Sequence, residues 1–141
     1  MLAALGRSYW RWAVVPLLLL TFVVCLVPLA SDYIFFHPDE RHYVDAGLKM
    51  LDSGDYLSPR RPDGGLRLKK PVIPYWFVTT GFHAVGVSVL GARIVFLLAG
   101  AALIALSWWT AWIAFESRKA ALFAALAAMC HPALLISAPR S

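Results

Sequence analysis

Hydrophobic residues along the chain gather in three long runs that polar connections separate. The first two contain no charged residue, and the third is interrupted only by His131-Pro132. The runs are Ala13–Ala30, Ile94–Phe115 and Ala120–Pro139. A stretch of roughly 20 apolar residues can cross the hydrocarbon core of a bilayer as a helix. Helices are expected because the bilayer offers no water to backbone amides. The pattern predicts three transmembrane helices, at about 12–30, 92–115 and 120–137.

The first run has a second interpretation, as a secretory signal peptide with Arg7 and Arg11 at its basic start and Ala30 at its cleavage site. Pro28 fits poorly where a small residue is needed, and further apolar runs follow. An uncleaved membrane anchor is therefore favoured. The Trp and Arg residues at positions 7–12 are typical of an interfacial belt.

The polar connection from Ser31 to Lys70 holds seven of the eight acidic residues and seven of the thirteen basic ones. Within it, His37-Pro38-Asp39-Glu40 has the order expected at a helix start, with a capping residue, then proline and then acids. Gly54 provides a left-handed cap at the other end. Three apolar residues share one helical face: Val44, Leu48 and Leu51. We predict an amphipathic helix on the membrane surface, from about Asp39 to Ser53.

The stretch from Pro71 to about Val85 is apolar and aromatic. It is long enough to be considered as a fourth span, but glycines at 81, 86 and 91 interrupt it and almost no loop precedes the next run. A second interfacial helix is favoured. The predicted fold is an all-α integral membrane protein, with three transmembrane helices and two juxtamembrane amphipathic helices in the first loop, at about 31–90.

Composition supports the membrane class, because 60% of the 141 residues are hydrophobic and only 15% are charged. Cys25 and Cys130 both lie in apolar runs and define no disulfide framework. The sequence shows no basic patch beside an element that could contact bases, so no sequence pattern indicates nucleic-acid binding. A count of basic residues places the long connection inside the cell, but most of its charges lie far from the first span. Charge alone therefore leaves the orientation open.

Several motifs in the long connection occur in the order seen in one group of enzymes. They are Asp39-Glu40, the helix Tyr43–Leu51, Ser53-Gly54-Asp55, Lys70-Pro71, Pro74-Tyr75-Trp76 and Gly91-Ala92-Arg93. From about Tyr33 to Arg93 the chain resembles the start of a GT-C membrane glycosyltransferase of the protein mannosyltransferase and aminoarabinose lipid A transferase (ArnT-like) superfamily. The order and spacing of the motifs are more specific than any one of them.

The resemblance implies an inverting transfer of a sugar from a polyprenyl-phosphate donor to a lipid or protein acceptor at the outer face of a bacterial inner membrane. It places the loop of residues 31–70 outside the cytoplasm. By residue, it implies catalytic roles for Asp39 and Glu40, and donor contacts for Tyr43 and Lys70, with Lys70 at the lipid phosphate. A carboxylate can take the acceptor's proton, and an ammonium stabilises the charge left on the phosphate.

Two departures from the family pattern affect this interpretation. Lys69 stands where some relatives have an acid, so the sequence does not support a divalent metal or any other cofactor there. Family members are also several times longer and have about a dozen spans. The chain is therefore expected to be an N-terminal piece with a truncated GT-C fold, inactive by itself. The alternative is a small, non-enzymatic three-span protein that binds lipid or a partner protein.

Each candidate residue also has a simpler interpretation. Asp39 and Glu40 are the residue types that a helix start favours, by roughly 0.3–1 kcal/mol each. Lys69 and Lys70 are also typical of contacts to anionic headgroups. Arg60 and Lys69 are candidate phosphate contacts. Arg60, Arg61 and Arg67 could together hold phosphate, but a solvated basic loop is favoured. His37, Asp39, Glu40 and His42 match no metalloprotease spacing. His131-Pro132 is expected to break a helix.

Overall fold

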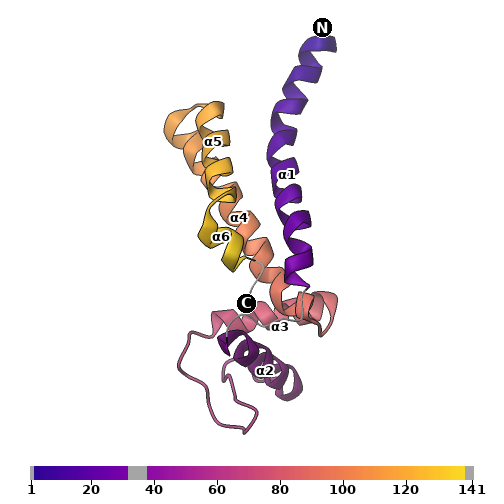
Figure 1. Cartoon of the computed structure of the whole chain (residues 1–141), viewed down its shortest axis with the longest axis vertical. Coiled ribbons are helices and arrows are strands. Elements are labelled where there is room, and N and C mark those ends of the chain that lie inside the picture. The colour runs from indigo at the N-terminus through magenta and orange to yellow at the C-terminus, as the bar shows by residue number, and fades with distance from the viewer. Residues whose placement is uncertain (1, 32–37, 139–141) are drawn as a thin grey trace.

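The computed structural model describes residues 2–31 and 38–138, and the side chains of residues 2–14, Pro38 and Asp39 are not part of that description. Within these residues the chain forms six helices (Figure 1). They are α1 (Leu2–Ala30), α2 (Pro38–Ser53), α3 (Ile73–Val85), α4 (Val89–Phe115), α5 (Arg118–Met129) and α6 (Pro132–Ser137). No strand occurs in this part of the chain, apart from an isolated bridge between Arg60 and Leu66. The prediction of an all-helical fold is confirmed.

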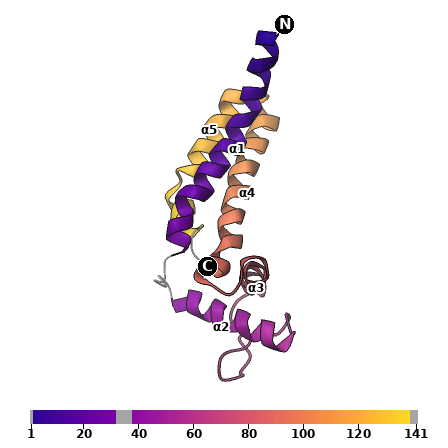
Figure 2. The ribbon, with the colours of Figure 1, turned by 90° about the vertical axis from the view of Figure 1, so that its right-hand side faces the viewer.

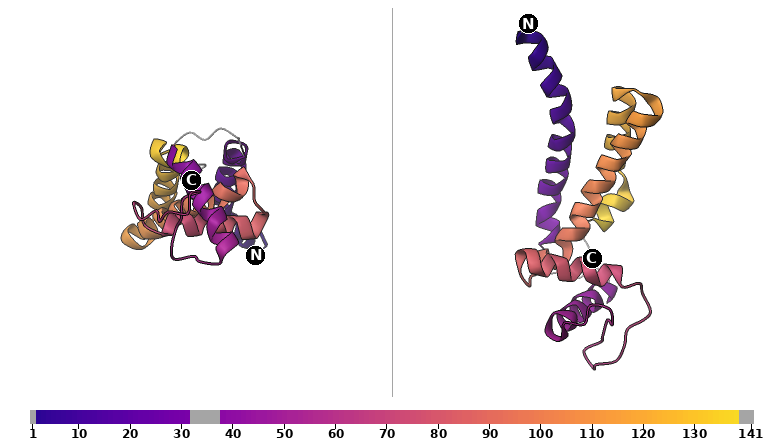
Figure 3. Two further views of the ribbon diagram at one scale, coloured as in Figure 1. Left: turned by 90° about the horizontal axis from the view of Figure 1, so that it is seen from below. Right: turned by 180° about the vertical axis from the view of Figure 1, so that it is seen from behind.

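Helices α1 and α4 form two long arms that approach each other where α1 ends and α4 begins (Figures 1 and 3). Phe22 and Leu26 of α1 are buried with Leu97 and Ile104 of α4 in one hydrophobic cluster. Gly100 permits the close approach, since a Cβ there would lie 3.3 Å from the ring of Phe22. The two helices therefore pack at one end and diverge toward the other.

The third apolar run is not one continuous helix. Helix α5 ends at Met129, and α6 begins at Pro132, which lacks the amide hydrogen needed to continue a helix. The expected break at His131-Pro132 is thus confirmed, and the predicted span at 120–137 consists of helices of 12 and 6 residues.

The prediction of three spans is not confirmed in the described residues. One helix there, Val89–Phe115, is long and apolar enough to cross a membrane, with a hydropathy of 2.4, and Val15–Ala30 forms a shorter apolar segment.

Helices α2 and α3 lie crosswise beneath the end where α1 and α4 meet (Figures 1 and 2). Glycines allow this stacking. A Cβ on Gly81 of α3 would overlap the carbonyl oxygen of Gly91 in α4, and a Cβ on Gly47 of α2 would lie 2.9 Å from Val78 of α3. Gly81 and Gly91, which interrupt an apolar run in the sequence, are thus a contact point between helices in the fold.

The predicted helix in the polar connection is confirmed as α2, one residue longer at its start. Gly54 follows it with φ +70°, and its amide donates to the carbonyl of Met50 at 2.9 Å. The apolar face expected from the periodicity packs against buried Val78 and Phe82 of α3. Its members are Val44, Leu48 and Leu51. Burial of this face fixes the rotation of α2 about its own axis relative to α3.

Candidate functional site

The most buried charged contact in the described residues joins Arg93, near the start of α4, to Glu40, in the first turn of α2. Arg93 Nε donates to Glu40 Oε1 at 2.5 Å, and the two side chains are 0% and 1% exposed. A charge within an apolar helix is costly unless it faces the protein interior and is paired. Glu40 supplies that pairing from 53 residues away in the sequence.

Arg93 also reaches the end of α1. Its Nη1 atom donates to the carbonyl oxygens of Leu29 at 3.2 Å and Ala30 at 3.4 Å. The last carbonyls of a helix have no partner within the helix, and a cation near them is favoured by the helix dipole. One guanidinium thus connects α1, α2 and α4. It holds the first turn of α2, which includes the backbone of Asp39, against the ends of the two long helices.

Two tyrosines pack between α2 and α3. The rings of Tyr43 and Tyr75 meet edge to face, with centroids 5.4 Å apart. Tyr75 is fully buried, and its hydroxyl has no hydrogen-bond partner among the described residues. Tyr43, for which the family resemblance implies a donor contact, has its ring packed on Tyr75 of the neighbouring helix.

The loop between α2 and α3 contains a short hairpin from Pro59 to Arg67. Its ends are joined by a hydrogen bond from Arg67 N to Pro59 O at 2.7 Å, and its turn by one from Arg61 N to Gly65 O at 2.8 Å. Gly64 N donates to Arg61 O at 2.9 Å, and Gly64 has φ +86°. A β-turn followed by a left-handed glycine is a common three-residue hairpin connection.

The arginines of the hairpin lie on two different faces. Residues opposite each other in an antiparallel pair point to the same face, and successive residues alternate. Arg60 is bridged to Leu66, so these two share one face. Arg61 and Arg67 occupy positions that point to the other face. Arg60 bends back onto the turn, where its Nη1 atom donates to Gly64 O at 3.2 Å.

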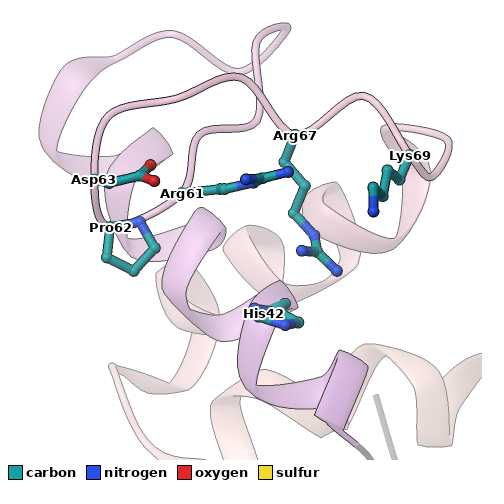
Figure 4. A pocket seen from close by; sticks show the side chains of 6 residues that line it. All are labelled: His42, Arg61, Pro62, Asp63, Arg67 and Lys69. Carbon is teal, nitrogen blue, oxygen red and sulfur yellow. The ribbon is translucent and has the colours of Figure 1, made fainter.

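A cavity of about 430 Å³ lies between this second face and α2. It is lined by His42, Arg61, Pro62, Asp63, Arg67 and Lys69 (Figure 4). Arg67 is only 8% exposed, whereas Arg61 and Lys69 are exposed at the rim. Asp63 is engaged within the turn, because its Oδ1 atom accepts from Gly65 N at 2.9 Å. The lining thus carries three positive charges, one negative charge and an imidazole.

The rest of the loop is held in place by polar contacts. Asp55 Oδ1 accepts from the amides of Leu57 and Ser58, at 3.1 Å each. The hydrogen bond from the Ser58 side chain, followed by the one from the Leu57 amide, lowers the pKa of Asp55 below its usual value. Trp76 Nε1 donates to Tyr56 O at 2.7 Å, which fastens the loop to α3. The segment before the hairpin is therefore held against α3.

The residues named from the sequence divide between several environments. Lys69 lines the cavity, whereas Lys70 is exposed in the turn before α3 and is not part of the lining. Arg60 also lies outside the lining. Asp39 belongs to α2, three positions before His42, and its side chain is outside the described part.

No group of three or more His, Cys, Asp or Glu side chains suited to a metal ion occurs among the described residues. His37 and Asp39, which belong to the sequence cluster considered for a metal, have side chains outside this part of the chain.

The sequence predicted no role for Arg93. It offered Arg61 and Arg67 for phosphate but favoured a solvated loop, and it did not join them with His42 in one site. Two patterns could have found them. An arginine just inside an apolar helix requires a buried acidic partner, and the polar connection before this helix holds seven of the eight acidic residues. Pro62-Asp63-Gly64 is a turn sequence, and a hairpin around it brings alternate arginines to one face.

Comparison with known proteins gives partial matches to bacterial glycosyltransferases. The chain is 36% identical over 94 residues to undecaprenyl phosphate-alpha-4-amino-4-deoxy-L-arabinose arabinosyl transferase 2 of Pseudomonas fluorescens strain Pf-5, covering 65% of this chain and 15% of that protein. The corresponding transferase of Pseudomonas paraeruginosa strain PA7 is also 36% identical over 94 residues, covering 65% of this chain and 17% of the relative.

An uncharacterised protein of Aquifex aeolicus strain VF5 is 35% identical over 86 residues, covering 56% of this chain and 17% of that protein. No family model matches the chain, and no solved structure matches it. The matches support a relationship to ArnT-like transferases, in agreement with the resemblance seen in the sequence motifs. The aligned segment is at most 17% of these relatives' length.

Proposed function

We propose that this chain takes part in glycosyl transfer from a polyprenyl-phosphate-linked sugar to a lipid or protein acceptor at the outer face of a bacterial inner membrane. The observation that carries the proposal is the similarity, 36% over 94 residues, to transferases whose names specify an undecaprenyl-phosphate-linked aminoarabinose. The chain corresponds to a small part of those enzymes, so the complete reaction requires further elements of the kind that they contain.

In the proposed mechanism the lipid phosphate leaves from the sugar as the acceptor oxygen attacks. Lys70 stabilises the negative charge that develops on the phosphate. Asp39 takes the acceptor's proton or orients its attacking oxygen. Glu40 has a different role, because its carboxylate is buried against Arg93. It holds the first turn of α2 in place and so positions the adjacent Asp39.

The proposed membrane arrangement follows from the hydrophobic surfaces. Helices α1 and α4 cross the bilayer, since their exposed side chains include many large apolar ones, such as Leu20, Val24, Leu103, Leu106 and Ile113. Helices α2 and α3 lie at the interface beneath them. Helices α5 and α6 enter the bilayer beside α4. In the complete enzyme these outer faces contact lipid or further spans.

The decisive experiment replaces Asp39 by Asn at the native gene. Sugar transfer in isolated membranes is measured with a labelled undecaprenyl-phosphate aminoarabinose donor. Transfer should fall about 100-fold or more, the range for loss of a general base, while the amount of protein in the membrane stays unchanged. Asp52→Asn, on an exposed position at the other end of α2, is the matched control. Unchanged transfer by Asp39→Asn would remove this residue from the mechanism.

A second candidate function is lipid binding without catalysis, which the basic cavity favours. It predicts that the native gene product binds anionic lipid but transfers no sugar, with or without Asp39. The labelled-donor assay distinguishes the two functions.

A further inference from the structure

The cavity beneath the hairpin concentrates positive charge at a place that the glycosyl-transfer mechanism does not use. Arg61, Arg67 and Lys69 point into the space above His42 from different parts of the loop (Figure 4). Lys70, the residue assigned to the donor phosphate, is outside the lining. We propose that this cavity is a separate binding site for a phosphate group.

The chemistry of the lining selects phosphate over other ligands. Guanidinium groups offer paired N–H donors that match the oxygens of a phosphate, and an ammonium adds a point charge. Arg61 and Lys69, both exposed at the rim, outweigh the one carboxylate of the lining, Asp63, whose Oδ1 already accepts from Gly65 N. A metal cation is repelled by this charge, and an apolar ligand would have to displace water from the charged groups.

The hairpin and Arg67 are in place before any ligand arrives. Arg67 is 8% exposed, and the hydrogen bond from its backbone amide to Pro59 O fixes its position in the hairpin. The volume of about 430 Å³ holds a phosphate group and several waters, each of which occupies roughly 30 Å³ in the liquid. Binding therefore has to order the exposed side chains of Arg61 and Lys69, whereas Arg67 is already buried.

The position of the cavity indicates how a ligand reaches it. The hairpin lies on the side of α2 that faces away from α1 and α4 in all the side views (Figures 1, 2 and 3). The phosphate therefore arrives from the aqueous side. Its source is either a soluble phosphate compound or a lipid headgroup that extends beyond the membrane surface. The proposal does not depend on glycosyl transfer.

The test uses the purified 141-residue chain in phosphatidylcholine nanodiscs. One arm titrates inorganic phosphate by calorimetry, and the other adds phosphatidic acid to the nanodiscs and counts bound lipid by native mass spectrometry. The variant Arg61→Gln/Lys69→Gln should lose about tenfold or more in affinity in at least one arm, since charged hydrogen bonds contribute about 1.5–3 kcal/mol each. The arm that responds identifies the source of the phosphate.

Arg60→Gln is the matched control, because it removes one charge from the same hairpin on the other face. Its affinity should stay within about twofold of the unaltered chain if specific contacts dominate over screened surface charge. An equal loss with Arg60→Gln would show general attraction and overturn the proposal. Absence of binding in both arms by the unaltered chain would overturn it as well.

Both changed positions are exposed, so the fold is expected to survive, and circular dichroism checks this. Lys70→Gln separates the two proposals, since it should weaken binding of undecaprenyl phosphate and leave binding of inorganic phosphate unchanged.

Discussion

At the residue scale, Arg93 makes more polar contacts than a single charge in an apolar helix needs. A guanidinium in this position needs one acidic partner, yet it also donates to two carbonyls at the end of α1. Removing one member of a buried ion pair leaves the other charge without compensation, whereas replacing both by apolar residues is often tolerated. Stability is therefore expected to fall most when only one member of the pair is replaced.

We accordingly expect Arg93→Leu to lower the free energy of unfolding by about 3–5 kcal/mol. The double variant Glu40→Leu/Arg93→Leu should be less destabilised than Arg93→Leu alone. Denaturant titration in detergent, followed by circular dichroism, completes the double-mutant cycle. A double variant as unstable as the sum of the two single changes would mean that the residues do not act as a pair.

Asp55 provides a prediction about pH. Hydrogen bonds from Ser58 and Leu57 lower its pKa in the folded chain relative to the ordinary value of 3.8. The ionised carboxylate thus stabilises the loop above about pH 4, and this contribution is lost as the pH falls through the lowered pKa. Below that value the Leu57 and Ser58 amides should lose protection from hydrogen exchange, measured relative to the intrinsic exchange rate at each pH. In Asp55→Asn, which keeps an acceptor oxygen but cannot titrate, the exchange of these amides should lose that dependence on protonation.

At the scale of the elements, local sequence patterns were enough to predict α2. Proline and acids at its start, an apolar face at helical spacing and Gly54 at its end are all visible in the sequence. The hairpin at Pro59–Arg67 cannot be predicted in the same way, because its pairing is short and depends on the turn geometry. The sequence therefore offered Arg60, Arg61 and Arg67 alike for phosphate, and only the hairpin separates Arg60 from the two arginines that line the cavity.

The glycines of α3 and α4 are a second case that local patterns did not decide. They looked like interruptions, but Gly81 packs against the backbone of Gly91. We expect Gly81→Ala to push the two helices apart and to lower the free energy of unfolding by about 1–3 kcal/mol, as overpacking does. Thr80→Ala, at the exposed neighbouring position, should have little effect. Equal stability of Gly81→Ala and the unaltered chain, by denaturant titration, would contradict this close contact.

At the scale of the whole molecule, composition and apolar runs predicted a helical chain, and the order of motifs predicted its relatives. The contact of Arg93 with two other helices could not be read from any window of the sequence, because its partners lie 53 to 64 residues away. The third apolar run is divided into α5 and α6, so hydropathy alone does not predict the number of spans.

Orientation is the property of the whole molecule on which the charge count and the family resemblance disagree. Helix α4 separates the layer of α2 and α3 from the turn at Glu116-Ser117, so if α4 crosses the membrane these two parts lie on opposite sides (Figure 1). We replace Cys25 and Cys130 by Ala and introduce one cysteine, at exposed Asp52 or at exposed Lys119. A maleimide that cannot cross membranes should label Asp52→Cys in intact cells and Lys119→Cys only after lysis. The reverse pattern would place the Asp39 region in the cytoplasm, where the proposed transfer at the outer face cannot occur.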